Sequence, residues 1–266
     1  MSLKVCPIAS GSNGNSFFVS NGSTSILVDA GQSGKRMEAG LASIGASCAG
    51  LQAIFVTHEH SDHIMGVGVL SRRFDIPVYA TKDTWYAMEN HTGIGNIAGK
   101  NKRFVYQDEA TQINDLSIKP FSIPHDAADP VAYSITANGK RAVIATDIGH
   151  ITDDILKNIT DTDVLLIESN HDEEMLRNGR YPAQLKRRVL GERGHLSNVS
   201  CGQLLSSAVT DRLRHVFLGH LSEENNRPLI AYETVSSILL SNGIKVNQTF
   251  RLHLAVRDAV STLVEV

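Results

Sequence analysis

Cysteine is scarce in this sequence. Only Cys6, Cys48 and Cys201 occur among the 266 residues, they lie far apart, and no Cys-x-x-Cys pair is present. An odd number of widely spaced thiols argues against a disulfide framework, and the missing pair argues against a zinc ribbon built from cysteine. We therefore expect a protein of the reducing cytoplasm.

Long apolar runs and a charge surplus are missing too. No stretch approaches the roughly 20 apolar residues of a spanning helix, and residues 1–10 contain no long apolar core, so neither a transmembrane helix nor a secretory signal is expected. With 25 basic and 28 acidic residues, the net charge is −3. That balance excludes a wholly basic protein that coats nucleic acid, but it leaves room for a local basic patch.

The sequence does contain enough apolar material for a large core. With 42% hydrophobic residues, no linker and no low-complexity run, we expect one domain over 1–266. The predicted strands are 3–8, 17–20, 25–29, 52–57, 77–80, 117–123, 131–136, 141–146, 164–168 and 215–218. The predicted helices are 37–44, 67–74, 198–209 and 228–243. Strands in antiparallel groups, with helices between the groups, favour two sheets with helices outside both.

Histidine is abundant, and the richest segment reads THEHSDH at positions 57–63. It directly follows a predicted strand, and loops at strand ends are where sites are built. Imidazole with carboxylate suits zinc, manganese or iron. His58 and His60 share a face if the strand geometry continues, while Asp62 and His63 fall on the next turn and could face a second ion. A polar loop that is rich in histidine by chance is the alternative.

Three further ligand candidates each stand at the end of a predicted strand: His125, Asp147 and His220. Each of them alone is typical of a polar residue that is simply hydrogen-bonded. Together they repeat one arrangement, an apolar strand followed by His or Asp. This arrangement is expected where several strands converge on one site.

These residues resemble the metallo-β-lactamase superfamily. Its His-x-His-x-Asp-His signature is met at positions 58–63, and its other motifs are matched by Asp29, His125, Asp147 and His220. The resemblance implies an α/β fold, the αββα four-layer sandwich, with a two-metal site at one edge.

The resemblance also implies how two divalent ions, Zn, Mn or Fe, are held. Such a pair lowers the pKa of a bridging water, supplies hydroxide near neutral pH and stabilises the developing oxyanion. Asp62 could orient the nucleophile as well, and Asp29 would orient the site from behind the ligands. The implied ligands are His58, His60 and His125 for one ion and Asp62, His63 and His220 for the other, with Asp147 bridging.

Two more residues, Glu168 and His195, make the sequence resemble the nuclease branch of the superfamily. Glu168 ends a buried strand, and His195 stands just ahead of a predicted helix. A similar Glu and His pair serves proton transfer in ribonuclease Z. The resemblance thus implies that His195, held by Glu168, protonates a leaving oxygen as a general acid. The alternative is that Glu168 pairs structurally and that His195 only enters a helix.

Basic residues gather between positions 177 and 193, where Glu192 is the only acid. The cations Lys186, Arg187, Arg188 and Arg193 could grip the phosphates of a nucleic-acid backbone. Such contacts give affinity that depends on salt and not on base sequence. A solvated helix face is the alternative.

Outside the metal motifs, segments 9–16, 33–35 and 218–226 resemble the YycJ (WalJ) family of bacteria. This resemblance implies a cytoplasmic, metal-dependent DNA exonuclease that acts 5′ to 3′. No membrane contact is indicated, and the sequence identifies no stable protein partner. Two other functions stay open: hydrolysis of a small phosphodiester, ester or lactone in the same site, and a regulatory protein that keeps the fold without turnover.

The glycine-rich segment 10–16 could approach a phosphate through backbone N–H groups or merely connect two strands.

Overall fold

Two seven-stranded sheets form the centre of the structure, a computed structural model that describes residues 2–266. The first sheet has the order β14-β1-β2-β3-β4-β5-β6, and the second has the order β13-β12-β11-β10-β9-β8-β7. The strands of the first sheet are β1 (Lys4–Ala9), β2 (Ser16–Ser20), β3 (Ser25–Val28), β4 (Ala53–Phe55), β5 (Val78–Ala80), β6 (Lys102–Phe104) and β14 (Val264–Glu265). Those of the second are β7 (Thr111–Ile113), β8 (Leu116–Ser122), β9 (Val131–Ala137), β10 (Lys140–Ala145), β11 (Val164–Glu168), β12 (His215–Gly219) and β13 (Arg251–Leu254).

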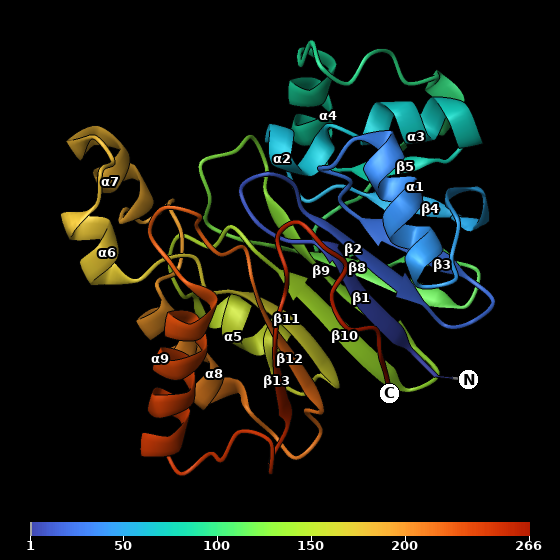
Figure 1. Cartoon of the computed structure of the whole chain (residues 1–266). Helices are drawn as coiled ribbons and strands as arrows, with labels where there is room; N and C mark the ends of the chain where they lie inside the picture. The colour runs from blue at the N-terminus through green and yellow to red at the C-terminus, as the bar shows by residue number, and fades with distance from the viewer. Residues whose placement is uncertain (1) are drawn as a thin grey trace.

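Helices cover the outer face of each sheet (Figure 1). The first sheet is covered by α1 (Gly34–Ser43), α3 (Val67–Phe74) and α4 (Lys82–Glu89), and the second by α5 (Asp153–Ile159), α8 (Asn198–Ala208) and α9 (Pro228–Ser241). The remaining helical segments are α2 (Ser61–Ile64), α6 (Glu173–Asn178), α7 (Ala183–Val189) and the 3₁₀ turns η1 (Cys48–Gly50) and η2 (Gly99–Asn101). The predicted αββα sandwich is therefore confirmed. No helix within residues 2–266 has the length and apolar composition that a membrane crossing requires.

The alternation of side chains along each strand divides the core into layers. In β11, Leu165 and Ile167 pack under the helices of the second sheet, whereas Val164 and Leu166 pack between the two sheets. Successive side chains of a strand point to opposite faces, so both faces of β11 are buried. Strands buried on both faces read as continuous apolar runs, which is why β11 was predicted with the bounds it has.

The pairing of the strands differs from our expectation. We predicted antiparallel groups, but each sheet joins an antiparallel half to a parallel half. The parallel halves are β3 to β6 and β10 to β13. Hydrophobic periodicity marks a strand without identifying its neighbour. The difference matters for function, because the carboxyl ends of parallel strands meet at one edge of a sheet and commonly build a site there.

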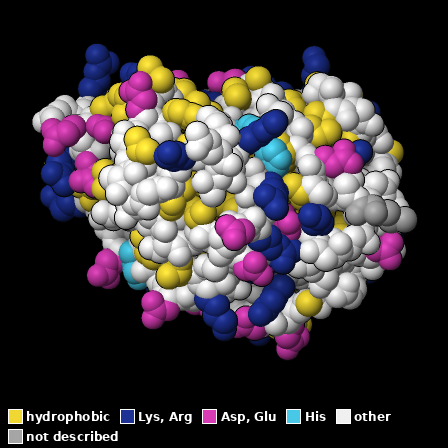
Figure 2. All heavy atoms as spheres, turned by 90° about the horizontal axis from the view of Figure 1, so that it is seen from below, with side chains coloured by type: hydrophobic (Ala, Val, Ile, Leu, Met, Phe, Trp, Pro, Cys, Tyr) yellow, Lys and Arg dark blue, Asp and Glu magenta, His cyan; other side chains and the backbone are white. Residues whose placement is uncertain are grey.

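The face at the opposite end of these strands carries charges of both signs. Figure 2 views the molecule from below Figure 1 and shows Lys and Arg side chains among Asp and Glu side chains. At the starts of β10 and β12, Lys140 and Arg212 pair with Asp163 at 3.4 Å and 2.8 Å. Because acids offset these cations, this face offers no uniform positive field to a nucleic acid.

Candidate metal centre

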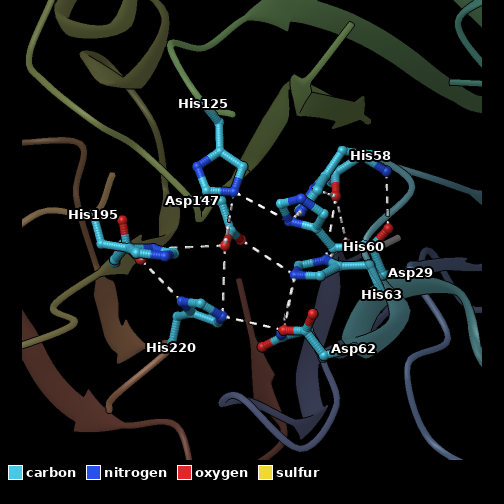
Figure 3. A network of polar contacts seen from close by, with 12 residues as sticks. Asp29, His58, His60, Asp62, His63, His125, Asp147, His195 and His220 are labelled. Atoms are coloured by element: carbon cyan, nitrogen blue, oxygen red, sulfur yellow. Dashed lines mark hydrogen bonds and ion pairs between the residues drawn. The ribbon is translucent and has the colours of Figure 1, made fainter. Parts of the chain in front are cut away.

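The side chains predicted to bind metal converge at one edge of the sandwich, where both sheets contribute (Figure 3). On the first sheet, Asp29 follows β3, and His58 and His60 follow β4, with Asp62 and His63 on the short helix α2. On the second sheet, His125 follows β8, Asp147 follows β10, Glu168 ends β11 and His220 follows β12. We expected Asp62 and His63 on a turn, and they lie instead in one helical turn.

Ligand atoms form clusters that could each hold a metal ion. Within each cluster these atoms lie within 4.8 Å of one another. The clusters are His58 with His60 and His125, Asp62 with His63 and His220, His58 with His63 and Asp147, and Asp147 with Glu168, His195 and His220. The shared members make this arrangement consistent with a binuclear site.

Three nitrogen atoms of the first cluster face one another in a way that suits a cation. His60 Nδ1 lies 3.1 Å from His58 Nε2 and 3.3 Å from His125 Nε2. A single proton on His60 could be shared with only one of the two other rings at a time. A cation, by contrast, accepts a lone pair from all three. The residues present therefore fit a bound metal.

The carboxylate of Asp147 stands between the two main clusters. It lies 3.3 Å from His63 Nε2 and 3.5 Å from His220 Nε2, and on the other side 3.8 Å from His125 Nε2. Asp62 Oδ2 approaches the same two nitrogens of His63 and His220, at 3.5 and 3.4 Å. Asp147 thus lies within 3.8 Å of ring nitrogens from both clusters.

The second ring nitrogen of four histidines is held by a neighbour. Such outer partners fix the tautomer and the orientation of a metal-binding ring. The partners are Asp29 Oδ2 for His63 at 2.7 Å, Thr57 Oγ1 for His58 at 3.0 Å, Gly194 O for His125 at 3.1 Å and Glu168 Oε1 for His220 at 2.9 Å. In each case Nε2 is left to face the centre.

Buried acids govern the charge of His63 in the metal-free protein. Burial alone would lower the pKa of the His63 imidazole, but Asp147, Asp29 and Asp62 outweigh it and raise that pKa well above its usual range. A metal ion must displace the proton from Nε2 to bind there. Metal uptake should therefore release protons.

Glu168 and His195 lie together, as the sequence suggested. His195 Nδ1 is 2.7 Å from Glu168 Oε1, and the other carboxylate oxygen accepts backbone hydrogen bonds from Ile148 and Leu196. Burial would raise the pKa of the Glu168 carboxyl, but His195 and His220 outweigh it and hold that pKa at about 2. Glu168 therefore stays ionised and fixes two imidazoles at once.

Three of the converging residues have left-handed backbone. The φ angles are 59° at Asp29, 61° at Asp147 and 54° at His220. Such values are uncommon outside glycine and mark strain that the surroundings must hold. Each of the three residues follows a strand, so the left-handed turn redirects its side chain into the site.

Sequence reasoning missed residues that support the site from neighbouring loops. Asn15 Nδ2 lies 3.1 Å from both Asp62 Oδ2 and His63 Nε2, and the Ser10 hydroxyl accepts a hydrogen bond from the His220 N–H at 2.8 Å. Both belong to the segment 10–16 that was singled out for a phosphate. Small polar residues in a glycine-rich connection were the only signal available.

The predicted phosphate-binding cations are in part engaged. Lys186 Nζ donates to the Arg177 carbonyl at 2.7 Å, and Arg188 forms a two-pronged ion pair with Asp126. Among residues 2–266, Arg187 and Arg193 have no ion-pair partner. The segment therefore keeps free positive charge beside the site.

Comparison with known proteins agrees with this geometry. A family model described as beta-lactamase superfamily domain matches residues 24–220. The chain is 40% identical to exodeoxyribonuclease YycJ of Bacillus anthracis over 95% of each chain. It is 38% identical to exodeoxyribonuclease WalJ of Streptococcus pneumoniae strain D39, over 99% of this chain and 98% of that one. Among solved structures, the metallo-β-lactamase fold protein YhfI from Bacillus subtilis aligns over 100% of both chains, with a TM-score of 0.72 and 16% identity.

Proposed function

The chain belongs to the metallo-β-lactamase superfamily, and we propose that it is a DNA exonuclease that hydrolyses phosphodiester bonds from the 5′ end. The similarity to two exodeoxyribonucleases over nearly the whole chain supports DNA as the substrate. The observation that carries the chemistry is the Glu168–His195 pair beside the metal clusters. It provides a proton donor where a leaving oxygen would depart.

The ligand set that we propose follows the distances. One ion would be held by His58, His60 and His125 and the other by Asp62, His63 and His220, and Asp147 would be shared between them. When bound, two divalent ions, Zn, Mn or Fe, supply an acidified water and polarise the phosphodiester. Asp29 orients His63. Asp62 lines a cavity of about 190 Å³ beside the metal clusters and would also orient the attacking water.

His195 acts as the general acid in this proposal. Its Nδ1 is committed to Glu168 at 2.7 Å, so the ring offers Nε2 to the cavity that it lines together with Asp62, Asp147 and His220. A proton on Nε2 can pass to the departing oxygen, and the Glu168 carboxylate stabilises the positive ring before that transfer. Glu168→Gln should therefore lower kcat and, because Glu168 Oε1 also holds His220, weaken binding of the ion assigned to that ring.

Free cations next to the cavity would hold the DNA backbone. Arg187 lies on α7, and Arg193 lines a larger cavity that adjoins His125. Lys186 and Arg188 belong to the same basic segment, although in this structure they contact Arg177 and Asp126. Binding through phosphate contacts weakens steeply as salt rises.

The test is digestion of linear DNA labelled at the 5′ or the 3′ end, after metal stripping and after restoration of Mn²⁺ or Zn²⁺. We expect metal-dependent release of the 5′ label first, with a rate that falls steeply with salt. The His63→Ala variant, purified identically, controls for contaminating nucleases. No digestion under either metal, or the same digestion by His63→Ala, would overturn the proposal and favour a small phosphodiester or ester as substrate.

A further inference from the structure

Two cavities flank the metal centre. The smaller, of about 190 Å³, is lined by the candidate ligands His60, Asp62, Asp147 and His220 and by residues of the α6–α7 segment. The larger, of about 590 Å³, is lined by His125, the loop that follows it, and Arg193. Pockets that enclose drug-sized ligands measure about 300–1,000 Å³, so the smaller cavity can receive part of a single nucleotide but not a longer stretch of a strand.

The α6–α7 segment forms one wall of the smaller cavity. In Figure 1 these two helices project from the sandwich, beside the loop between β8 and β9. From this segment Tyr181, Leu185, Arg188 and Val189 line the cavity. This wall of the cavity is thus partly apolar, with one tyrosine ring and one guanidinium.

An ion pair stands at the boundary between the two cavities. Arg188 lines the smaller one, whereas His125 and Ala127, the two neighbours of Asp126, line the larger one. Arg188 Nη2 lies 3.0 Å from Asp126 Oδ1, and its Nε also bonds to Asp126. While this pair is formed, it joins α7 to the loop after β8.

A buried polar side chain in the wall of the smaller cavity points to a ligand. Asn225 is 1% exposed, it lines the cavity, and neither its amide nitrogen nor its amide oxygen has a hydrogen-bond partner within residues 2–266. Leaving such groups unpaired is costly, and native structures rarely do so without a reason. Ser12, Ser222 and Asn170 make the same wall polar.

We propose that the smaller cavity receives the terminal nucleotide, and that the Arg188–Asp126 pair, which joins α7 to the loop after β8, keeps a strand from running on into the larger cavity and so restricts the enzyme to chain ends. The proposal rests on the proposed nuclease function and assigns its mode of action. The phosphodiester lies at the metal clusters, the terminal nucleotide lies under Tyr181 and Leu185, and Asn225 offers it a donor and an acceptor. Opening the ion pair would join the cavities into one groove that accepts an internal stretch of a strand.

The test compares linear and circular single-stranded DNA of one sequence. We expect wild-type protein to digest only the linear form. Arg188→Gln and Asp126→Asn, which each remove one charge of the pair, should raise the cleavage of circles relative to linear DNA by up to about fivefold, the upper limit for the loss of an exposed ion pair. Exchanging the two residues, Arg188→Asp with Asp126→Arg, should restore the wild-type preference.

The matched control is Arg177→Ala. Arg177 forms an exposed ion pair with Glu173 at 3.0 Å on the same segment, but it lines neither cavity. Its loss should not produce cleavage of circles. Absence of circle cleavage by both Arg188→Gln and Asp126→Asn, while they digest linear DNA, would overturn this inference alone. Circle cleavage by the wild type would overturn this inference together with the exonuclease assignment. A wild-type protein that leaves both forms intact would instead overturn the proposed function.

Asn225 is tested through inhibition by the product. A deoxynucleoside 5′-monophosphate should compete with linear DNA, and Asn225→Ser should weaken that inhibition by about tenfold, as expected for the loss of one hydrogen bond. Asn90→Ser is the control, because Asn90 is exposed and bonds only within α4. Equal inhibition of wild type and Asn225→Ser would remove Asn225 from the subsite.

Discussion

Replacing Asp29 by asparagine tests how the ion near His63 is held. Asp29 Oδ2 accepts hydrogen bonds from His63 Nδ1 at 2.7 Å and from Thr57 Oγ1 at 2.8 Å, while Oδ1 accepts from the Thr57 N–H. Asparagine keeps the Oδ1 acceptor, but it places an NH₂ group where Oδ2 stood, so both bonds to Oδ2 lose their acceptor. It also tolerates the left-handed φ of 59° at this position.

The expected magnitude follows from the bond to His63. A hydrogen bond to a charged group contributes about 1.5–3 kcal/mol, and about 1.4 kcal/mol is a factor of ten in binding. We therefore expect Asp29→Asn to weaken binding of the ion assigned to Asp62, His63 and His220 by about 10- to 100-fold, as losses of such outer partners do. The other ion should be affected much less, because within residues 2–266 no hydrogen bond joins Asp29 to its rings.

Metal-free protein would be titrated with Zn²⁺ or Mn²⁺ in competition with a chromophoric chelator. The control is Asp75→Asn, because Asp75 also has left-handed backbone, with φ of 56°, but is exposed and bonds to Lys100 and Asn101. It should bind both ions as the wild type does. Two ions bound with wild-type affinity by a folded Asp29→Asn would refute the reasoning.

Three further predictions concern packing, pH and metal. A Cβ at Gly31 would lie 1.7 Å from the Asp62 carbonyl oxygen. Gly31→Ala should therefore lower the free energy of unfolding by about 1–3 kcal/mol and reduce metal content. Gly99→Ala should do neither, because a Cβ at Gly99 meets open space. Burial lowers the pKa of His171 from 6.5 to about 4, so the unfolded chain takes up a proton first as pH falls. Stability from this group is full above pH 6.5 and is lost towards pH 4. Between pH 6.5 and pH 4, the free energy of unfolding of metal-free His171→Asn, measured with urea, should therefore fall by about 3 kcal/mol less than that of the wild type. Metal at a hundredfold excess over its Kd should raise the free energy of unfolding, again measured with urea, by about 2.7 kcal/mol. An unchanged urea midpoint would contradict a metal site that forms only in the folded chain.

Most buried elements could be predicted from the sequence, because periodicity records burial. Helix α3 and strand β11 have the predicted bounds, 67–74 and 164–168. The elements missed are α4 to α7 and the strands β6, β7, β13 and β14, together with the single turns α2, η1 and η2. In α6 only Leu176 is buried, and in α7 only Val189, so neither helix carries an apolar stripe to detect. The four missed strands are only two to four residues long, and pairing with their neighbours defines them more than their own sequence does.

The site was easier to predict than its supports. Each candidate ligand is a His or Asp in a short segment that follows a strand, and this pattern is visible along the chain. The supports depend on contacts between distant segments. Ser10 meets His220 across 210 positions, and Arg188 meets Asp126 across 62. Asn225 was noticed only as part of a family-like segment, because burial and lack of partners are properties of the folded chain.

The strained residues show why the sequence could not reveal the whole site. A left-handed turn at His220 would suit glycine, yet a histidine stands there and needs its backbone held. The Ser10 hydroxyl accepts from its N–H at 2.8 Å, and Asn170 Nδ2 donates to its carbonyl at 2.9 Å. At Asp29, the N–H donates to the Phe55 carbonyl at 2.7 Å. The folded chain thus fixes these turns from other segments before any metal arrives, and a preorganised ligand set loses less conformational entropy on binding.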